Sequence, residues 1–358
     1  MSTNKIKVLI VDDSAFMRKA LDDMITKDID VEVVGFARNG KEAIELTASL
    51  DPDVVTLDVA MPVMDGLEAL KVIMKDYPRP VIMVSSLTTE GANSTLDALE
   101  IGAVDFIAKD KSYASFGILK IEKDLVEKIK FFGLKRQKKT FDEFKKVDVV
   151  TKLEKAKEKS PKINVSESAD IDVIGIGTST GGPQALQKVI PFMPADLGRP
   201  VLIVQHMPPN FTKSLADRLN SLSNLTVIES QGKEKLEKNI VYIAKGGYHL
   251  KIRKIGPHFY TELTHEPSNV LYIPSVDVLF TSIANNYKGK AIGVIMTGMG
   301  RDGLKGCQLI KSNGGKIIAQ DEASCIVYGM PKAVFEANLV DSVCSVERIT
   351  DEIIKYCT

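Results

Sequence analysis

Residues 177–181, GTSTG, follow an apolar run and precede a helix-like pattern, and their spacing could support two kinds of chemistry. As a G-x-S-x-G turn between a strand and a helix, the segment would present Ser179 as a nucleophile. Together with Gly175, it would instead be a glycine-rich loop that holds the pyrophosphate of a dinucleotide. Other residues of the chain have to distinguish these two interpretations.

A dinucleotide site needs an acidic residue about twenty positions further on, at the end of the next strand, to bind the ribose. The next apolar run, RPVLIVQHMPP, ends instead in Gln205 and His206, and this histidine could act as a general base for Ser179. A later run, IGVIMTGMGRDG, carries Asp302, which could orient the base, and glycines whose N–H groups could approach an oxyanion. The residues therefore favour a Ser-His-Asp triad.

Two alternatives to a hydrolase stay open, an NADP-dependent oxidoreductase and a binding module without catalysis. Cys325 is a rival nucleophile within the hydrolase interpretation, but no histidine accompanies it in the pattern. A buried, inert thiol is the commoner state of such a residue. The other three histidines lie in or beside a hairpin-like segment, where we expect solvated or packing roles.

Acidic residues end two predicted strands in the first part of the chain, with Asp12 and Asp13 after one and Asp58 at the end of the other. In a parallel sheet these carboxylates gather at one edge, where a Mg²⁺ ion would neutralise them. Two further strand ends bring Ser85 and Lys109 to the same edge and supply a hydroxyl and a cation. The set predicts a site that accepts a phosphoryl group.

The elements that must position these residues alternate regularly. Apolar, β-branched runs of strand length are separated by segments with helical periodicity, from residue 5 to about 130 and again from about 170. This order predicts an α/β fold with two doubly wound parallel sheets. The segment HLKIRKIGPHFYTELTHE predicts a hairpin insertion that turns at Gly256-Pro257.

Length and composition agree with two soluble domains, because 358 residues exceed what one hydrophobic core usually supports. A basic, charged stretch separates the halves, so we expect domains at 1–130 and 170–358 with a linker at 131–169. The formal net charge of zero gives no reason to expect a nucleic-acid partner. The four cysteines lack C-x-x-C spacing, and neither a signal peptide nor a membrane span is visible, so we expect a cytoplasmic protein without membrane insertion.

The first half resembles the flavodoxin-like receiver domains of response regulators over essentially residues 5–130. The resemblance implies that Asp58 is the phosphoacceptor, that Asp12, Asp13 and Asp58 hold Mg²⁺, and that Lys109 pairs with the phosphate. It implies Ser85 as the switch hydroxyl, with Ser86 as the alternative. One departure is Asp110, which stands where the family usually has proline.

The second half resembles the catalytic domain of the CheB family of chemotaxis protein-glutamate methylesterases over residues 170–358. The motifs that carry this resemblance are IGTSTGGPQAL, VQHMPPNFTKSLADRL, PSVDVLF, VIMTGMGRDG and EASCIVYGMP. It implies a Rossmann-like domain in which Ser179 is the nucleophile, His206 the base and Asp302 its orienter. Thr180 and Met299 then lie where oxyanion stabilisation is expected. Tyr272 and Ile273 depart from a usual His-Arg pair.

The resemblance also implies the reaction, its regulation and its partners. Methyl groups would be removed from glutamate methyl esters of chemoreceptors, and receptor glutamines would be deamidated, without any cofactor for the esterase. A chemotaxis histidine kinase would supply the phosphoryl group to the receiver, and phosphorylation would regulate the hydrolase. Mg²⁺ would serve the receiver alone.

Overall fold

The structure is a computed structural model that describes residues 5–109, 116–137 and 171–357. The chain divides into two compact units, Met1–Val147 and Asp148–Thr358. The predicted linker lies almost entirely outside the described residues, as does Asp110. Within the described ranges, no helix combines the length and the apolar character needed to cross a bilayer.

The first unit is a five-stranded sheet in the order β2-β1-β3-β4-β5, and every neighbouring pair is parallel. Helices α1 and α5 contact one another, whereas α2, α3 and α4 contact each other in sequence. The elements are β1 (Ile6–Val11), α1 (Ala15–Ile25), β2 (Val31–Ala37), α2 (Gly40–Leu50), β3 (Val54–Asp58), α3 (Gly66–Asp76), β4 (Val81–Ser86), α4 (Thr89–Ile101), β5 (Asp105–Lys109) and α5 (Phe116–Gln137).

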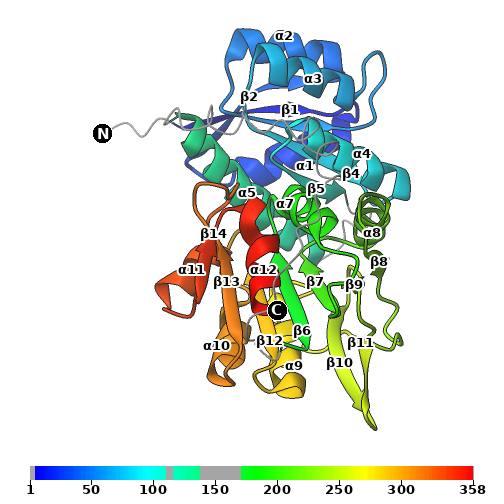
Figure 1. Ribbon diagram of the computed structural model, residues 1–358. Coiled ribbons are helices and arrows are strands. Elements are labelled where there is room, and N and C mark those ends of the chain that lie inside the picture. The colour runs from blue at the N-terminus through cyan, green and yellow to red at the C-terminus, as the bar shows by residue number, and fades with distance from the viewer. Residues whose placement is uncertain (1–4, 110–115, 138–170, 358) are drawn as a thin grey trace. The chain divides into compact units, whose positions relative to one another are not determined.

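The second unit is a seven-stranded parallel sheet in the order β14-β13-β12-β6-β7-β9-β8 (Figure 1). Its first part contains β6 (Val173–Thr178), α7 (Gly182–Val189), β7 (Val201–Gln205), α8 (Phe211–Leu222), β8 (Thr226–Glu229), β9 (Ile240–Ile243), β10 (His249–Ile255) and β11 (His258–Thr264). Its second part contains α9 (Val276–Tyr287), β12 (Ala291–Ile295), α10 (Leu304–Ser312), β13 (Lys316–Gln320), α11 (Met330–Glu336), β14 (Ser342–Cys344) and α12 (Ile349–Cys357), with short 3-10 turns at Ile190–Phe192 and Val346–Arg348.

The strands form where the sequence is continuously apolar, because a parallel sheet is covered on both faces. Strand β6 is buried over its whole length, and so are β7 and β12, its neighbours in the sheet. Helix α9 packs on β6, β12 and α10, and its apolar side chains belong to the main core cluster of this unit. This arrangement brings the carboxyl ends of β12, β6 and β7 side by side.

The predicted fold class is confirmed in both units. The hairpin is also confirmed, since Ile255 pairs with His258 across the two-residue turn at Gly256-Pro257. Strand β14, which has three residues and lies at the edge of the second sheet, was not predicted from the sequence. Helix α5 continues to Gln137, past the predicted end of the first domain, and the Gln137 side chain donates to Asp53 at 2.9 Å.

Candidate active site and acidic cluster

Ser179 and His206 follow directly on paired positions of two neighbouring strands. Strands β6 and β7 are in a register that pairs Thr178 with Gln205, and the next residue of each strand is a predicted site residue. The backbone N–H of His206 donates to the Thr178 carbonyl at 3.1 Å. The nucleophile and base predicted from sequence are therefore held together by the sheet itself.

The side chain of Gln205 links the ends of β6 and β7 by hydrogen bonds. Its buried amide nitrogen donates to the carbonyl oxygens of Ser179, at 2.9 Å, and His206, at 3.2 Å. Its amide oxygen accepts from the Thr178 hydroxyl. The side chain that would have to be acidic in a dinucleotide site is thus a neutral amide used in structural bonds.

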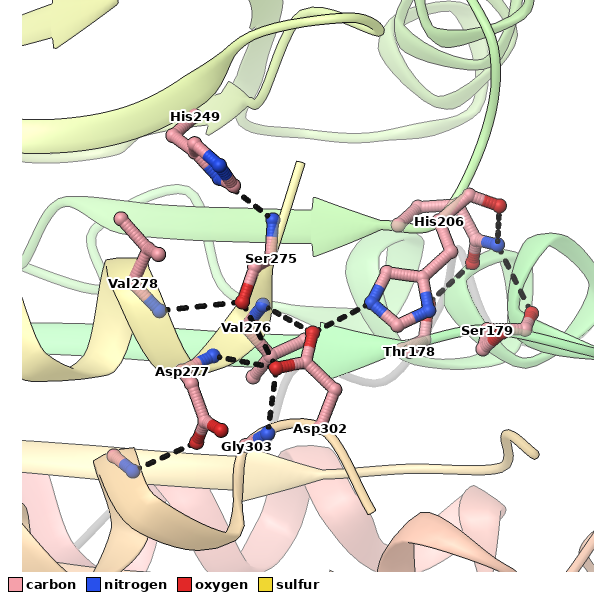
Figure 2. Close-up of polar contacts among 12 residues, drawn as sticks. Thr178, Ser179, His206, His249, Ser275, Val276, Asp277, Val278, Asp302 and Gly303 are labelled. Carbon is pink, nitrogen blue, oxygen red and sulfur yellow. Dashed lines mark hydrogen bonds and ion pairs between the residues drawn. The ribbon is translucent and has the colours of Figure 1, made fainter. Parts of the chain in front are cut away.

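His206 is bonded to Asp302, which lies in the loop between β12 and α10. The imidazole Nε2 and the Asp302 Oδ2 are 2.8 Å apart, with side chains only 6% and 10% exposed (Figure 2). Because an ionised carboxylate can only accept, Nε2 carries the proton and Nδ1 is left as an acceptor. Nδ1 is buried and has no hydrogen-bond partner among the described residues.

Asp302 accepts hydrogen bonds from the start of α9, from its own loop and from His206. Its Oδ1 accepts from the hydroxyl of Ser275 at 2.9 Å, from the Asp277 N–H at 3.0 Å and from the Gly303 N–H at 3.1 Å. Its Oδ2 accepts from the Val276 N–H at 2.7 Å in addition to His206. Burial favours the neutral acid, but the bonds to His206 and the backbone outweigh it and hold the pKa of Asp302 below its ordinary value.

The N-terminus of α9 is also placed by a close approach to β6. A Cβ on Gly177 would lie 2.3 Å from the Val276 side chain, so only glycine lets the helix start come this near to the strand. Ser275 is the N-cap and accepts from the Val278 N–H at 3.4 Å. The helix dipole adds to the attraction between these N–H groups and the Asp302 carboxylate.

His249 lies behind this helix start and was assigned only a solvated or packing role from sequence. It is fully buried, its Nδ1 accepts from the Ser275 N–H at 3.1 Å, and its Nε2 is 3.1 Å from the Pro267 carbonyl. Burial lowers its pKa, which favours the neutral ring that this pair of bonds requires. Ser275 and His249 are therefore supporting residues that the sequence analysis missed.

The loop after β12 approaches Ser179 closely. The Ser179 N–H donates to the Thr297 carbonyl at 3.0 Å, and a Cβ on Gly298 would lie 2.8 Å from the Ser179 Cβ. The predicted oxyanion residues Thr180 and Met299 directly follow Ser179 and Gly298 in the sequence. Cys325, the rival nucleophile, is in no disulfide and is only 4% exposed.

Among the described residues, no hydrogen bond joins the Ser179 hydroxyl to His206. Catalytic hydrogen bonds in unliganded sites are often long and tighten only when substrate binds. The arrangement, with a buried acceptor nitrogen at the strand end next to a serine, can perform nucleophilic acyl transfer.

The acidic cluster predicted in the first unit is also assembled. Oxygen atoms of Asp12, Asp13 and Asp58 lie within 4.8 Å of one another. Lys109 Nζ is 2.8 Å from Asp12 Oδ2 and 2.7 Å from Asp58 Oδ2. Burial raises the pKa of Asp58, although Lys109 opposes this, and the bonds to both carboxylates raise the pKa of Lys109 against the effect of its burial.

This donor set fits Mg²⁺, because three carboxylates at one sheet edge are the hard oxygen ligands that the ion prefers. Ser85 is buried on β4 and donates to the Gly91 carbonyl at 3.0 Å, whereas the hydroxyl of Ser86 lies 3.0 Å from that of Thr88. The structure thus gives the two candidate switch serines different partners in and beside α4.

Comparisons with known proteins match both units. The family described as CheB methylesterase matches residues 174–353, and the family described as response regulator receiver domain matches residues 8–115. Two curated relatives carry the name protein-glutamate methylesterase/protein-glutamine glutaminase. The one from Lawsonia intracellularis is 45% identical, with 97% of this chain and 98% of the relative covered. The one from Halalkalibacterium halodurans is 46% identical, with 99% of each covered.

A solved structure of the Thermotoga maritima CheB methylesterase catalytic domain is 42% identical, with a TM-score of 0.51, and the match covers 52% of this chain and 98% of that one. Together these matches define a response regulator, in which a receiver domain is joined to an α/β enzyme domain. The chain belongs to the CheB methylesterase family.

Proposed function

We propose that this protein removes methyl groups from glutamate methyl esters of chemoreceptors and deamidates receptor glutamines, with Ser179 as nucleophile, His206 as base and Asp302 as its orienter. The observation that carries the proposal is the hydrogen bonding of the two ring nitrogens of His206. Its Nε2 is held by Asp302 at 2.8 Å, and its Nδ1 is buried and unpartnered at the strand end next to Ser179.

In the first half of the reaction, the Ser179 hydroxyl gives its proton to His206 Nδ1 while its oxygen attacks the γ-carbonyl carbon of the ester. The carbonyl electron pair moves onto oxygen, and backbone N–H groups of Thr180 and Met299 stabilise this oxyanion. Asp302 stabilises the imidazolium that forms. When the tetrahedral intermediate collapses, the methoxide takes the proton from Nδ1 and leaves as methanol.

In the second half, Nδ1 accepts a proton from water, and the resulting hydroxide attacks the glutamyl ester of Ser179. The collapse returns the proton to the Ser179 oxygen and releases a free glutamate. An amide follows the same route with ammonia as the leaving group, which accounts for the glutaminase part of the relatives' names. None of these steps needs a metal or an organic cofactor.

We propose further that phosphorylation of Asp58 by a chemotaxis histidine kinase regulates this reaction. Asp12, Asp13 and Asp58 would hold Mg²⁺, which neutralises charge on the incoming phosphoryl group. Lys109 already contacts Asp58 and would pair with the phosphoryl oxygens, and Ser85 would bond them as the switch hydroxyl. In this proposal residues 1–130 form the receiver, 131–169 the linker and 170–358 the catalytic domain.

The test is methanol release from methyl-labelled receptor membranes by the full chain. We expect release by the wild type and a loss of several orders of magnitude in Ser179→Ala. A Cys325→Ala variant is the matched control for the rival nucleophile, and we expect it to keep its activity. Near-wild-type release by Ser179→Ala would overturn the proposal.

A further inference from the structure

Tyr272 lies flat against the imidazole of the proposed base. The ring centroids of Tyr272 and His206 are 4.1 Å apart and the ring planes differ by 13°, which is a stacked arrangement. Tyr272 belongs to the segment before α9, three residues ahead of the N-cap Ser275. The same short segment therefore supplies a ring to His206 and the hydroxyl that bonds Asp302.

The tyrosine also reaches the loop beside the nucleophile. Its Oη would lie 3.6 Å from a Cβ placed on Gly300, which follows Met299 in the loop after β12. Tyr272 itself is partly exposed, whereas the His206 side chain is only 6% exposed. The tyrosine ring thus covers one face of the imidazole.

One hydrogen bond does not fix the orientation of an imidazole. The bond from Nε2 to Asp302 holds one point on the ring, and Nδ1 has no partner among the described residues that would hold a second. Since Cγ is attached to the side chain and Nε2 is held by Asp302, the ring plane could still rotate about the line through these two atoms without the stacked neighbour. Since the Nδ1 lone pair lies in the ring plane, that rotation would turn it away from the Ser179 hydroxyl.

We propose that Tyr272 is a positioning residue for His206: its stacked ring fixes the plane of the imidazole and so aims Nδ1 at Ser179. The aromatic face does this, and the tyrosine hydroxyl is not required. This inference rests on the proposed roles of Ser179 and His206 in the hydrolase. It adds a residue that contacts the base and does not itself exchange protons.

The experiment compares Tyr272→Leu with Tyr272→Phe in the full chain. Methanol release from methyl-labelled receptor membranes is measured over a range of receptor concentrations to separate kcat from KM. We expect Tyr272→Leu to lower kcat by about tenfold, the upper end of what an aromatic pair contributes, with KM within about twofold. Tyr272→Phe keeps the stacked face and should restore most of kcat.

A second readout does not depend on activity. Diethyl pyrocarbonate modifies accessible imidazoles, and peptide mass analysis separates His206 from the other three histidines. We expect His206 to react several times faster in Tyr272→Leu than in the wild type or in Tyr272→Phe. Tyr260→Leu is the matched control, a tyrosine of the hairpin strand β11, and should change neither the His206 rate nor kcat.

A wild-type kcat in Tyr272→Leu, or a Tyr272→Phe variant as slow as Tyr272→Leu, would overturn the inference. An unchanged modification rate in Tyr272→Leu would overturn it as well. A failure of the proposed function looks different, because Ser179→Ala would then keep its methanol release. In that case the modification rates still decide whether the Tyr272 ring holds and covers the imidazole of His206.

Discussion

Ser275→Ala tests whether the start of α9 supports the proposed triad. The substitution removes the hydroxyl that donates to Asp302 Oδ1 at 2.9 Å and accepts from the Val278 N–H at 3.4 Å. It leaves the backbone of the helix start in place. Asp302 would keep its bonds from Val276, Asp277 and His206, and the loss would be confined to one charge-assisted bond and one cap.

The magnitudes follow from these two bonds. A hydrogen bond to a charged group contributes about 1.5–3 kcal/mol. An N-cap contributes about 1 kcal/mol, and less where the capping bond is long, as it is here. We therefore expect the free energy of unfolding to fall by about 2–3 kcal/mol and kcat by about tenfold, because Asp302 is loosened but not removed. Asp302→Asn, which gives the wrong tautomer, should lose about 10⁴-fold.

The assay is denaturant unfolding combined with methanol release from labelled receptors. Ser282→Ala is the matched control, since Ser282 lies on the same helix and accepts from the Ile252 N–H at 2.8 Å, away from Asp302. Ser282→Ala should lower the free energy of unfolding by an amount similar to that for Ser275→Ala and leave kcat unchanged. If both serine variants reduced kcat equally, or if Ser275→Ala reduced neither quantity, the start of α9 would not be supporting Asp302 through the Ser275 hydroxyl.

Four shorter predictions concern other parts of the molecule. A small phosphodonor with Mg²⁺ should raise methanol release by the wild type but not by Asp58→Asn, and an equal rise in both would contradict the proposed regulation. Because the folded pKa of Asp302 is lowered, its bonds stabilise the protein fully above the ordinary value of 3.8, and this contribution is lost as pH falls through the lower folded pKa. The difference in unfolding free energy between wild type and Asp302→Asn should therefore narrow in acid. A difference that stays constant with pH would contradict a stabilising role of the ionised Asp302 carboxylate. Gly298→Val should lower kcat by about 100-fold by displacing Ser179, whose Cβ would lie 2.8 Å from the new Cβ, and unchanged kinetics would reject this. Ile273→Arg should change only the affinity for receptors, and a large fall in kcat would show that position 273 affects the chemistry.

The positions of the strands along the chain could be predicted, because the sequence signals for strands are local. The runs that became β6, β7 and β12 are continuously apolar and end in glycine or polar turns. Parallel strands then place their carboxyl ends at one edge, which is how Ser179 and His206 could be placed together from sequence. The same reasoning placed Asp12 and Asp58 beside Lys109 in the first unit.

The support around the proposed triad could not be predicted, because it comes from tertiary packing of distant segments. Ser275 has the sequence signature of an N-cap, but nothing local says that its hydroxyl donates to Asp302. His249 was grouped with the hairpin and is bonded to Ser275 across the core. The stacking of Tyr272 on His206 likewise depends on where the segment before α9 lies relative to the end of β7.

The most direct measurement is covalent labelling of the full chain with a fluorophosphonate, followed by peptide mass analysis. Such reagents react with a serine only where a neighbouring base activates it. We expect one adduct, on Ser179, which forms in the wild type and is lost or strongly slowed in His206→Ala. An adduct on a different residue, or equal labelling of Ser179 with and without His206, would contradict it.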